Sequence, residues 1–274
     1  MSMFDIVGQD NLIKKLNNYT LDTFPHSIIL SGEEGSGKHM ISNYISENIL
    51  KLPLIDISDK ISYETIDNIY RNPNPTIYFI NTSSLVEKEQ NSLLKFIEEP
   101  FKSIFIIIAC ENLNVLLNTV LNRCVVFELE EYRKEDLKKF IPSNLENKDL
   151  ILNVVKTPGK LINTNIYNLT GLFDLCDKII EKLGLASYAN TLSISDKLNY
   201  KDNYDKYDLN IFFDTLLYKL YLKYKEENNN LLLDMYLLTV DYRKKLVDKR
   251  LNKEILIQNY LTNLWKLHKS KVSL

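Results

Sequence analysis

A glycine-rich segment near the N-terminus has the spacing of a phosphate-binding loop. Gly32, Gly37 and Lys38 fit the pattern G-x-x-x-x-G-K, and Gly35 adds a further glycine inside it. In such a loop, backbone N–H groups curl around a phosphate, and the helix that follows adds the positive end of its dipole. We therefore expect Gly32, Gly35, Gly37 and Lys38 to bind nucleotide phosphates. A glycine turn before a helix, without any ligand, is the simpler alternative.

The residues that would handle magnesium depart from this pattern. Ser or Thr usually follows the lysine, but here the residue is His39, and imidazole is a poor ligand for Mg²⁺. An acidic residue usually ends a nearby strand, but the apolar segment 76–80 is followed by Asn81 and Thr82, and neither can act as a base near pH 7. The loop is therefore expected to hydrolyse ATP inefficiently, whether or not it holds ATP or ADP.

Alternating strands and helices are predicted to position this loop. The run 103–109 is continuously apolar, as expected for a central parallel strand that is covered on both faces. Amphipathic helical segments separate it from the other apolar runs. This alternation over residues 1–129 predicts an α/β domain, an open parallel sheet with helices on both faces. The predicted strands are 28–30, 54–57, 76–80, 103–109 and 125–127, and the predicted helices include 61–69, 87–99 and 113–121.

No convincing strand follows residue 130, where apolar residues recur at helical spacing. Residues 169–274 are therefore expected to form an all-α domain, and a polar, tyrosine-rich stretch at 196–208 is expected to be a loop. The predicted helices are 132–140, 147–155, one beginning at Thr157, 171–183, 208–225, 231–249 and 253–268.

Length and composition are those of a soluble protein of about two domains. The chain has 274 residues, of which 45% are hydrophobic and 26% charged, with a formal net charge of −2. That charge argues against a protein whose main task is to coat DNA. The three cysteines are isolated, which argues against a disulfide framework or a zinc site and favours a reducing cytoplasm. We find neither a secretory signal nor an apolar run long enough to cross a membrane.

Several segments resemble the clamp-loader subunits of bacterial DNA polymerase III, a family of AAA+ proteins. Residues 90–100 (Gln-Asn-Ser-Leu-Leu-Lys-Phe-Ile-Glu-Glu-Pro) resemble the family segment NALLKTLEEP, and Asn122-Arg123-Cys124 occupies the place of its Ser-Arg-Cys motif. The matching segments occur in the order found in the family and cover about residues 3–165. The remaining matches are 4–9, 24–26, 61–69 and 157–160.

The resemblance implies an AAA+ domain at 1–129, a small helical lid at 130–168 and a helical collar at 169–274. Clamp loaders are spirals of five subunits that use ATP at subunit interfaces to place a sliding clamp on primer–template DNA. The partners implied are therefore other loader subunits, the clamp and, through the assembled complex, DNA. Subunits of this family that have lost hydrolytic residues still complete a neighbour's ATP site, and the losses at His39 and Asn81 fit that role.

The resemblance also implies roles for individual residues. Arg123 is implied to be an arginine finger, inserted in trans into a neighbour's ATP site, as against a solvated surface arginine. Lys160 is implied to face nucleotide phosphates from the start of its helix, as against a surface lysine. The segment from Phe4 to Val7 is implied to flank an adenine, or else to anchor the N-terminus to the core.

The chain also departs from the family, and two other functions stay open. Related subunits carry a four-cysteine zinc module after the phosphate-loop helix, but residues 50–56 contain no cysteine, so we expect no zinc. A divergent bacterial or phage-encoded version is compatible with this loss. The alternatives are an ATP-hydrolysing loader subunit that uses His39 and Asn81, and a non-catalytic AAA+ adaptor, for example in helicase loading.

Overall fold

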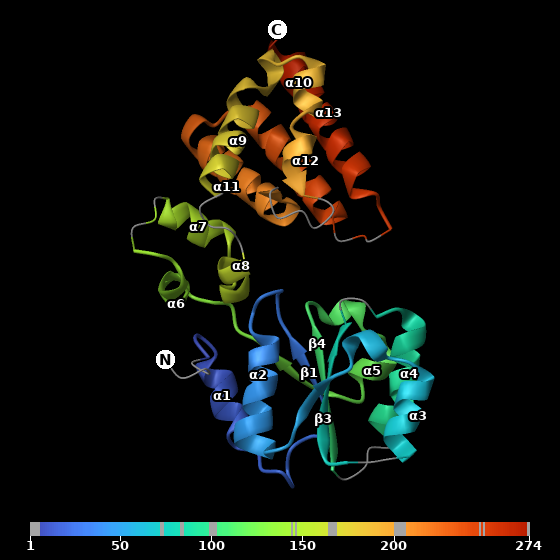
Figure 1. Ribbon diagram of the computed structural model, residues 1–274. Coiled ribbons are helices and arrows are strands. Elements are labelled where there is room, and N and C mark those ends of the chain that lie inside the picture. The colour runs from blue at the N-terminus through green and yellow to red at the C-terminus, as the bar shows by residue number, and fades with distance from the viewer. Residues whose placement is uncertain are drawn as a thin grey trace. The chain divides into compact units, whose positions relative to one another are not determined.

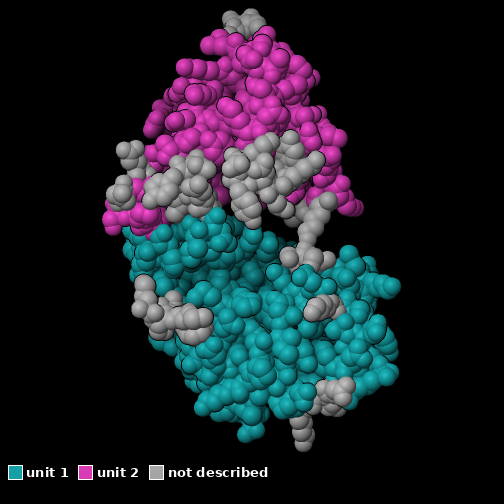
Figure 2. Space-filling view, in the orientation of Figure 1, with its two compact units in different colours: residues 1–140, 156–163 teal, residues 141–155, 164–274 magenta. Residues whose placement is uncertain are grey.

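The computed structural model describes residues 6–71, 74–82, 85–98, 103–143, 145, 147–163, 169–199, 207–246, 248 and 250–272. The chain divides into two compact units, unit 1 with residues 1–140 and 156–163 and unit 2 with residues 141–155 and 164–274 (Figure 2). The expected lid is thus divided between the two units. Sequence predictions that lie outside the described residues concern Phe4, Ser83, Ser84, Glu99, Pro100 and residues 200–206.

Unit 1 is built on a five-stranded sheet with strand order β2-β3-β4-β1-β5 (Figure 1). Every neighbouring pair in this sheet runs parallel. All residues of β1 and β4, two of the three interior strands, are buried, which explains their apolar runs. The predicted open parallel sheet is confirmed. Its strands are β1 Ser27–Ser31, β2 Leu54–Asp56, β3 Thr76–Asn81, β4 Ile104–Cys110 and β5 Val125–Glu128.

Helices cover both faces of this sheet (Figure 1). Because side chains alternate along a strand, Ile28 and Leu30 pack toward α1 and α2, whereas Ile29 packs toward α3, α4 and α5. The helices of unit 1 are α1 Asp10–Leu16, α2 Lys38–Tyr44 with a π-helical continuation Ile45–Leu50, α3 Tyr63–Arg71, α4 Glu87–Glu98, α5 Asn118–Leu121, α6 Lys134–Leu137 and α8 Pro158–Asn163.

The continuous helix predicted at 113–121 is wrong. A short 3-10 helix, Leu113–Val115, is followed by extended backbone at Leu116 and Leu117, and α5 begins only at Asn118. The buried side chain of Gln90 explains this break. Its Nε2 donates to the Val115 carbonyl at 3.0 Å and its Oε1 accepts from the Leu117 N–H at 2.9 Å, so a side chain replaces helical backbone bonds.

Unit 2 is predominantly helical, as predicted, and its largest fully buried side chain is Tyr260. The prediction that no strand follows residue 130 is wrong in one detail: β6 Leu198–Asn199 and β7 Tyr207–Asp208 form a parallel pair within the predicted loop. Two-residue strands are too short to produce a period in the sequence. The helices of unit 2 are α7 Lys148–Val154, α9 Leu169–Lys182, α10 Tyr188–Leu192, α11 Leu209–Glu227, α12 Asn230–Lys245 and α13 Lys253–Val272. None of the helices in the described ranges could cross a bilayer.

Candidate functional site

The phosphate-loop sequence follows the carboxyl end of β1 and leads directly into α2. Gly32 N–H donates to the Cys110 carbonyl of β4 at 3.1 Å, which fixes the start of the loop to the centre of the sheet. Gly35 (φ +76°) and Gly37 (φ +89°) lie in the left-handed region, which glycine adopts without steric cost. The glycine positions therefore give the loop the backbone conformation that its sequence pattern predicts.

The side chain of Lys38 turns back onto this loop. Its Nζ donates to the carbonyls of Gly32 at 2.6 Å and Glu33 at 2.8 Å. An ammonium group has three donors, so one remains for another acceptor. Burial lowers the pKa of Lys38, while the Glu111 carboxylate opposes this shift and the Lys160 ammonium adds to it. The positive charges of Lys38 and Lys160 thus repel each other, and an anion bound between them would reduce this repulsion.

Three further loop carbonyls accept hydrogen bonds from residues outside the loop. The Thr157 hydroxyl donates to Glu34 O at 2.8 Å, the Gly159 N–H donates to Gly35 O at 2.9 Å, and the Tyr132 hydroxyl donates to Ser36 O at 2.7 Å. All the donors belong to unit 1. These bonds attach the start of α8 and the segment after β5 to the loop.

The hydrogen bonds that these outside residues donate to the loop carbonyls also orient the loop's N–H groups. In a trans peptide the C=O and the following N–H point in opposite directions, so the bonds to Glu34 O and Ser36 O turn the amides of Gly35 and Gly37 the other way. Within the described part of the chain, these two amides have no hydrogen-bond acceptor. Free amides beside Lys38 form the kind of concavity that binds anions.

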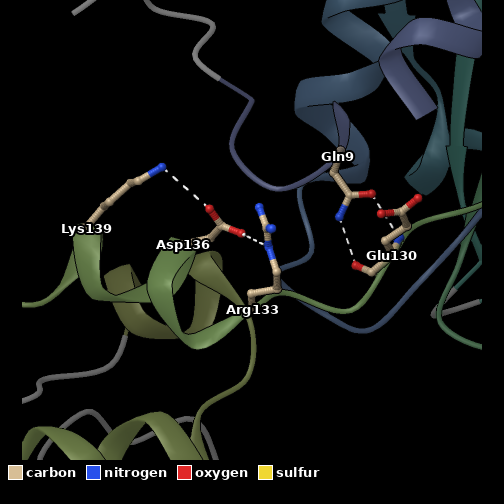
Figure 3. Close-up of polar contacts among 5 residues, drawn as sticks. All are labelled: Gln9, Glu130, Arg133, Asp136 and Lys139. Carbon is tan, nitrogen blue, oxygen red and sulfur yellow. Dashed lines mark hydrogen bonds and ion pairs between the residues drawn. The ribbon is translucent and has the colours of Figure 1, made fainter. Parts of the chain in front are cut away.

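Tyr132 contacts the N-terminal segment, which is itself bound to Glu130 two residues earlier (Figure 3 shows the bonds between Gln9 and Glu130). The buried Gln9 side chain donates to Glu130 O and accepts from Glu130 N–H, both at 2.9 Å. The Tyr132 ring then lies so close to Gly8 that a Cβ there would come within 2.9 Å of it. A pocket of about 70 Å³ beside Tyr132 is lined also by Ser36, Glu130 and Thr157. Val7, predicted to flank a nucleotide base, is half-buried immediately before Gly8.

The structure places His39 and Asn81 in different surroundings. The His39 ring packs edge-on against Phe79, with the ring centroids 4.9 Å apart, and its Nδ1 lies 3.3 Å from Asn43 Nδ2. Asn81 ends β3, where its backbone N–H donates to the Ser58 hydroxyl at 2.8 Å. Across the described residues, no three His, Cys, Asp or Glu side chains are grouped to hold a metal ion.

Arg123 lies at the amino end of the strands, opposite the end that carries the phosphate loop. It precedes β5, which runs parallel to β1 with Val125 beside Ile28, so Arg123 is near the amino end of β1. The phosphate loop follows the carboxyl end of the same strand. β1 is five residues long, so its two ends are roughly 13 Å apart, which is longer than an arginine side chain. Arg123 therefore cannot reach the loop of its own chain.

The Arg123 guanidinium is bound to two groups in the described structure. Its Nε forms an ion pair with Glu98 Oε1 at 2.6 Å, and its Nη1 donates to the Thr119 carbonyl at 2.8 Å. Both charged side chains are still accessible, 39% exposed for Arg123 and 45% for Glu98. The guanidinium could therefore contact a neighbouring molecule.

The structure thus brings together Lys38, Lys160 and the three predicted glycines, and separates Arg123 from them. Sequence reasoning missed Tyr132 and Glu98. Glu98 lies in the quoted segment 90–100, so its acidic side chain next to a candidate arginine could have been considered. No local pattern marks Tyr132, because its position depends on the distant Gln9.

Comparison with known proteins relates the chain to replication proteins. Residues 55–133, which include Arg123, match the family described as DNA polymerase III, delta subunit. DNA polymerase III subunit gamma of Buchnera aphidicola is 28% identical over 170 residues, covering 50% of this chain and 47% of that protein. The replication factor C small subunit of Methanococcus vannielii is 25% identical over 170 residues, covering 56% and 53%. The chain thus spans about half the length of the curated relatives it matches.

Two solved structures are similar at low sequence identity. A DNA polymerase III gamma subunit-related protein of Thermotoga maritima has a TM-score of 0.49 and 16% identity, covering 95% of this chain and 99% of that chain. The RuvB Holliday junction branch migration motor of the same organism has a TM-score of 0.48 and 16% identity, covering 78% and 70%. The sequence matches relate the chain to the clamp-loader subunits.

Proposed function

We propose that this homologue of clamp-loader subunits is a non-hydrolysing, delta-prime-like subunit of a DNA polymerase III sliding-clamp loader. In this role the chain supplies Arg123 to the ATP site of a neighbouring subunit and helps to hold the loader together. Its own phosphate loop binds ATP or ADP without efficient turnover. An arginine finger supplied in trans increases the rate of phosphoryl transfer by roughly 10³–10⁵-fold in other P-loop proteins.

The position of Arg123 is the observation that carries this proposal. The guanidinium is exposed at the amino end of the strands, opposite the chain's own phosphate loop. It can therefore act on a phosphate only if another molecule brings that phosphate to it. The family match over residues 55–133 includes Arg123 and leaves out the phosphate loop at 32–38.

The residues around Lys38 support binding without hydrolysis. The loop has the glycine conformations that suit phosphate, and its Gly35 and Gly37 amides meet no acceptor among the described residues. Lys38 and Lys160 add positive charge. His39 packs against Phe79 and offers no hydroxyl, while Asn81 offers no carboxylate. A bound nucleotide would therefore lack both a well-held magnesium ion and a base to activate water.

The partners follow from the same proposal. They are the other subunits of a five-subunit loader, the sliding clamp and, through the complex, primer–template DNA, all in the cytoplasm. Residues 130–168 would serve as the lid and 169–274 as the collar that joins the subunits. Contact with DNA would be mainly to backbone phosphates.

Two measurements test this function with the intact chain. ATP hydrolysis by the purified chain should stay at the background level, with and without primed DNA. Mixing with the gamma-type ATPase subunit from the same genome should give a stable complex on size exclusion and an increased, clamp- and DNA-dependent rate. Turnover by the chain alone would favour a hydrolysing subunit. A complex with a helicase, and none with loader subunits, would favour an adaptor.

A further inference from the structure

The ion pair and the hydrogen bond made by Arg123 suggest a role for a second residue. We propose that Glu98 is a positioning residue for Arg123: its carboxylate holds the guanidinium in the orientation in which it meets the neighbour's phosphate. This inference rests on the proposed function of Arg123 as a finger acting in trans. It adds a residue that acts through Arg123 and does not itself contact the nucleotide.

The atoms used by the two bonds leave one end of the guanidinium available. Arginine has five N–H donors, and here Nε pairs with Glu98 while Nη1 donates one hydrogen to Thr119 O. Nη2 makes no hydrogen bond to any residue in the described ranges. The Nη1–Nη2 end is the fork that matches two oxygens of a phosphate. Glu98 and Thr119 therefore hold the inner side of the group and leave a phosphate-binding side.

Both anchors are fixed by the same helix, α4. Glu98 is its last residue, and Gln90, two turns earlier, binds Val115 O and Leu117 N–H at the start of the turn into α5. α5 in turn carries Thr119 and ends at Leu121, two residues before Arg123. The buried Leu93, Phe96 and Ile97 of α4 pack in one cluster with Val120 of α5. The ion pair with Glu98 and the hydrogen bond to Thr119 thus come from two helices, α4 and α5, that pack together in unit 1. The position of the guanidinium therefore depends on this packing.

Because the Arg123–Glu98 ion pair is accessible to solvent, we expect it to orient the guanidinium more than to stabilise the fold. Both side chains are well exposed, and ion pairs between exposed side chains contribute little to folding stability. A long arginine side chain in water samples many rotamers, and binding a phosphate requires one of them. A carboxylate that already selects this rotamer reduces the ordering needed when the partner arrives. The cost of losing Glu98 should therefore appear in the partner's reaction and not in unfolding.

The first test uses the purified chain alone. We would measure ¹⁵N relaxation of the Arg123 Nε–H group in wild type and in Glu98→Gln, with Asp67→Asn as a control that breaks another exposed arginine pair, Arg71–Asp67. The Arg123 order parameter should fall in Glu98→Gln and stay unchanged in Asp67→Asn, with both variants unfolding at the wild-type temperature. An unchanged order parameter in Glu98→Gln would overturn the proposal.

The second test measures ATP hydrolysis by the gamma-type subunit mixed with each variant. Glu98→Gln should lower the stimulated kcat by about tenfold, as expected when a catalytic group loses its orientation, with unchanged affinity between the chains. Asp67→Asn should match wild type, and Arg123→Ala should remove the stimulation. A normal rate with Glu98→Gln, beside a lost rate with Arg123→Ala, would overturn the role of Glu98 alone. A normal rate with Arg123→Ala would overturn the proposed function and this inference together.

Discussion

Gly159 donates its backbone N–H to the Gly35 carbonyl at 2.9 Å, and a Cβ on Gly159 would lie only 2.6 Å from the Gly35 Cα. Two glycines thus let the start of α8 contact the phosphate loop backbone to backbone. Gly35 has equally little room, because a Cβ there would come within 2.7 Å of the Lys160 backbone nitrogen. This contact is what places Lys160 near Lys38.

Replacing Gly159 by alanine should therefore loosen α8. The added methyl would overlap backbone atoms that cannot move independently, and overpacking of this kind costs about 1–3 kcal/mol. Urea unfolding should show this loss, and hydrogen exchange should become faster at residues 157–161 while β4 stays protected. Ile162→Ala, on the exposed side of the same helix, is the control and should change stability by less than about 0.5 kcal/mol. Equal effects of the two variants would contradict the close contact.

Gln9 should matter far more to stability than Asn11, although both bind Glu130. Gln9 is buried and satisfies the backbone N–H and carbonyl of Glu130, whereas Asn11 is exposed and donates to the Glu130 carboxylate. Gln9→Ala should reduce the free energy of unfolding by about 1–3 kcal/mol, because the buried Gln9 side chain and its two part-buried hydrogen bonds would be lost. Asn11→Ala should cost less than about 0.5 kcal/mol. Denaturant titrations of the two variants test this difference.

Nucleotide binding should depend little on magnesium. His39 provides no oxygen ligand, and Asn81 provides a neutral amide in place of the carboxylate that usually holds Mg²⁺ at this position. In calorimetric titrations with ATP, replacing EDTA by Mg²⁺ should change Kd by less than about threefold, and Lys38→Ala should remove binding. Tightening of tenfold or more by Mg²⁺ would contradict this account of the site. Absence of binding under both conditions would contradict the phosphate-binding role of the loop.

His268 should make the stability of unit 2 sensitive to mild acid. The side chain is buried, and burial lowers its pKa, an effect opposed by the hydrogen bond with the Ile180 backbone. Its Nε2 has no partner among the described atoms. The unfolded chain therefore binds a proton at a higher pH, near 6.5, than the folded chain does. Stability should be constant above about pH 6.5 and fall as the pH decreases below it.

Urea unfolding at several pH values measures this loss. For one proton, the slope approaches about 1.4 kcal/mol per pH unit between the two pKa values. His268→Gln should show a shallower slope between pH 6.5 and 5, because it removes the titrating group. The same slope in wild type and variant would show that His268 is not responsible.

The central part of the fold was predictable because its signals are local. The strands β1 and β4 are continuous apolar runs, and the alternation of strands with helices predicts a parallel sheet. The break between Val115 and Asn118 was not predictable, because it depends on Gln90, more than 20 residues away in the sequence. The short β6–β7 pair has no recognisable period.

The same distinction holds for the candidate site. Gly35, Gly37 and Lys38 were predictable because the loop's conformation depends on their own spacing. The place of Tyr132 depends on a side chain 121 positions from Glu130, so no local pattern contains it. The separation of Arg123 from Lys38 follows from the register of β5 on β1, which only the folded sheet defines.

The most direct test of the account is the effect of Arg123→Ala on a neighbour's ATP hydrolysis. The clamp- and DNA-stimulated rate of the gamma-type subunit would be measured with wild-type chain, with Arg123→Ala and with Arg71→Ala, another exposed arginine in an ion pair. The stimulated rate should fall by at least about 10³-fold with Arg123→Ala and stay normal with Arg71→Ala, and all three chains should form the complex equally well. Full stimulation by Arg123→Ala would contradict the proposed role of Arg123.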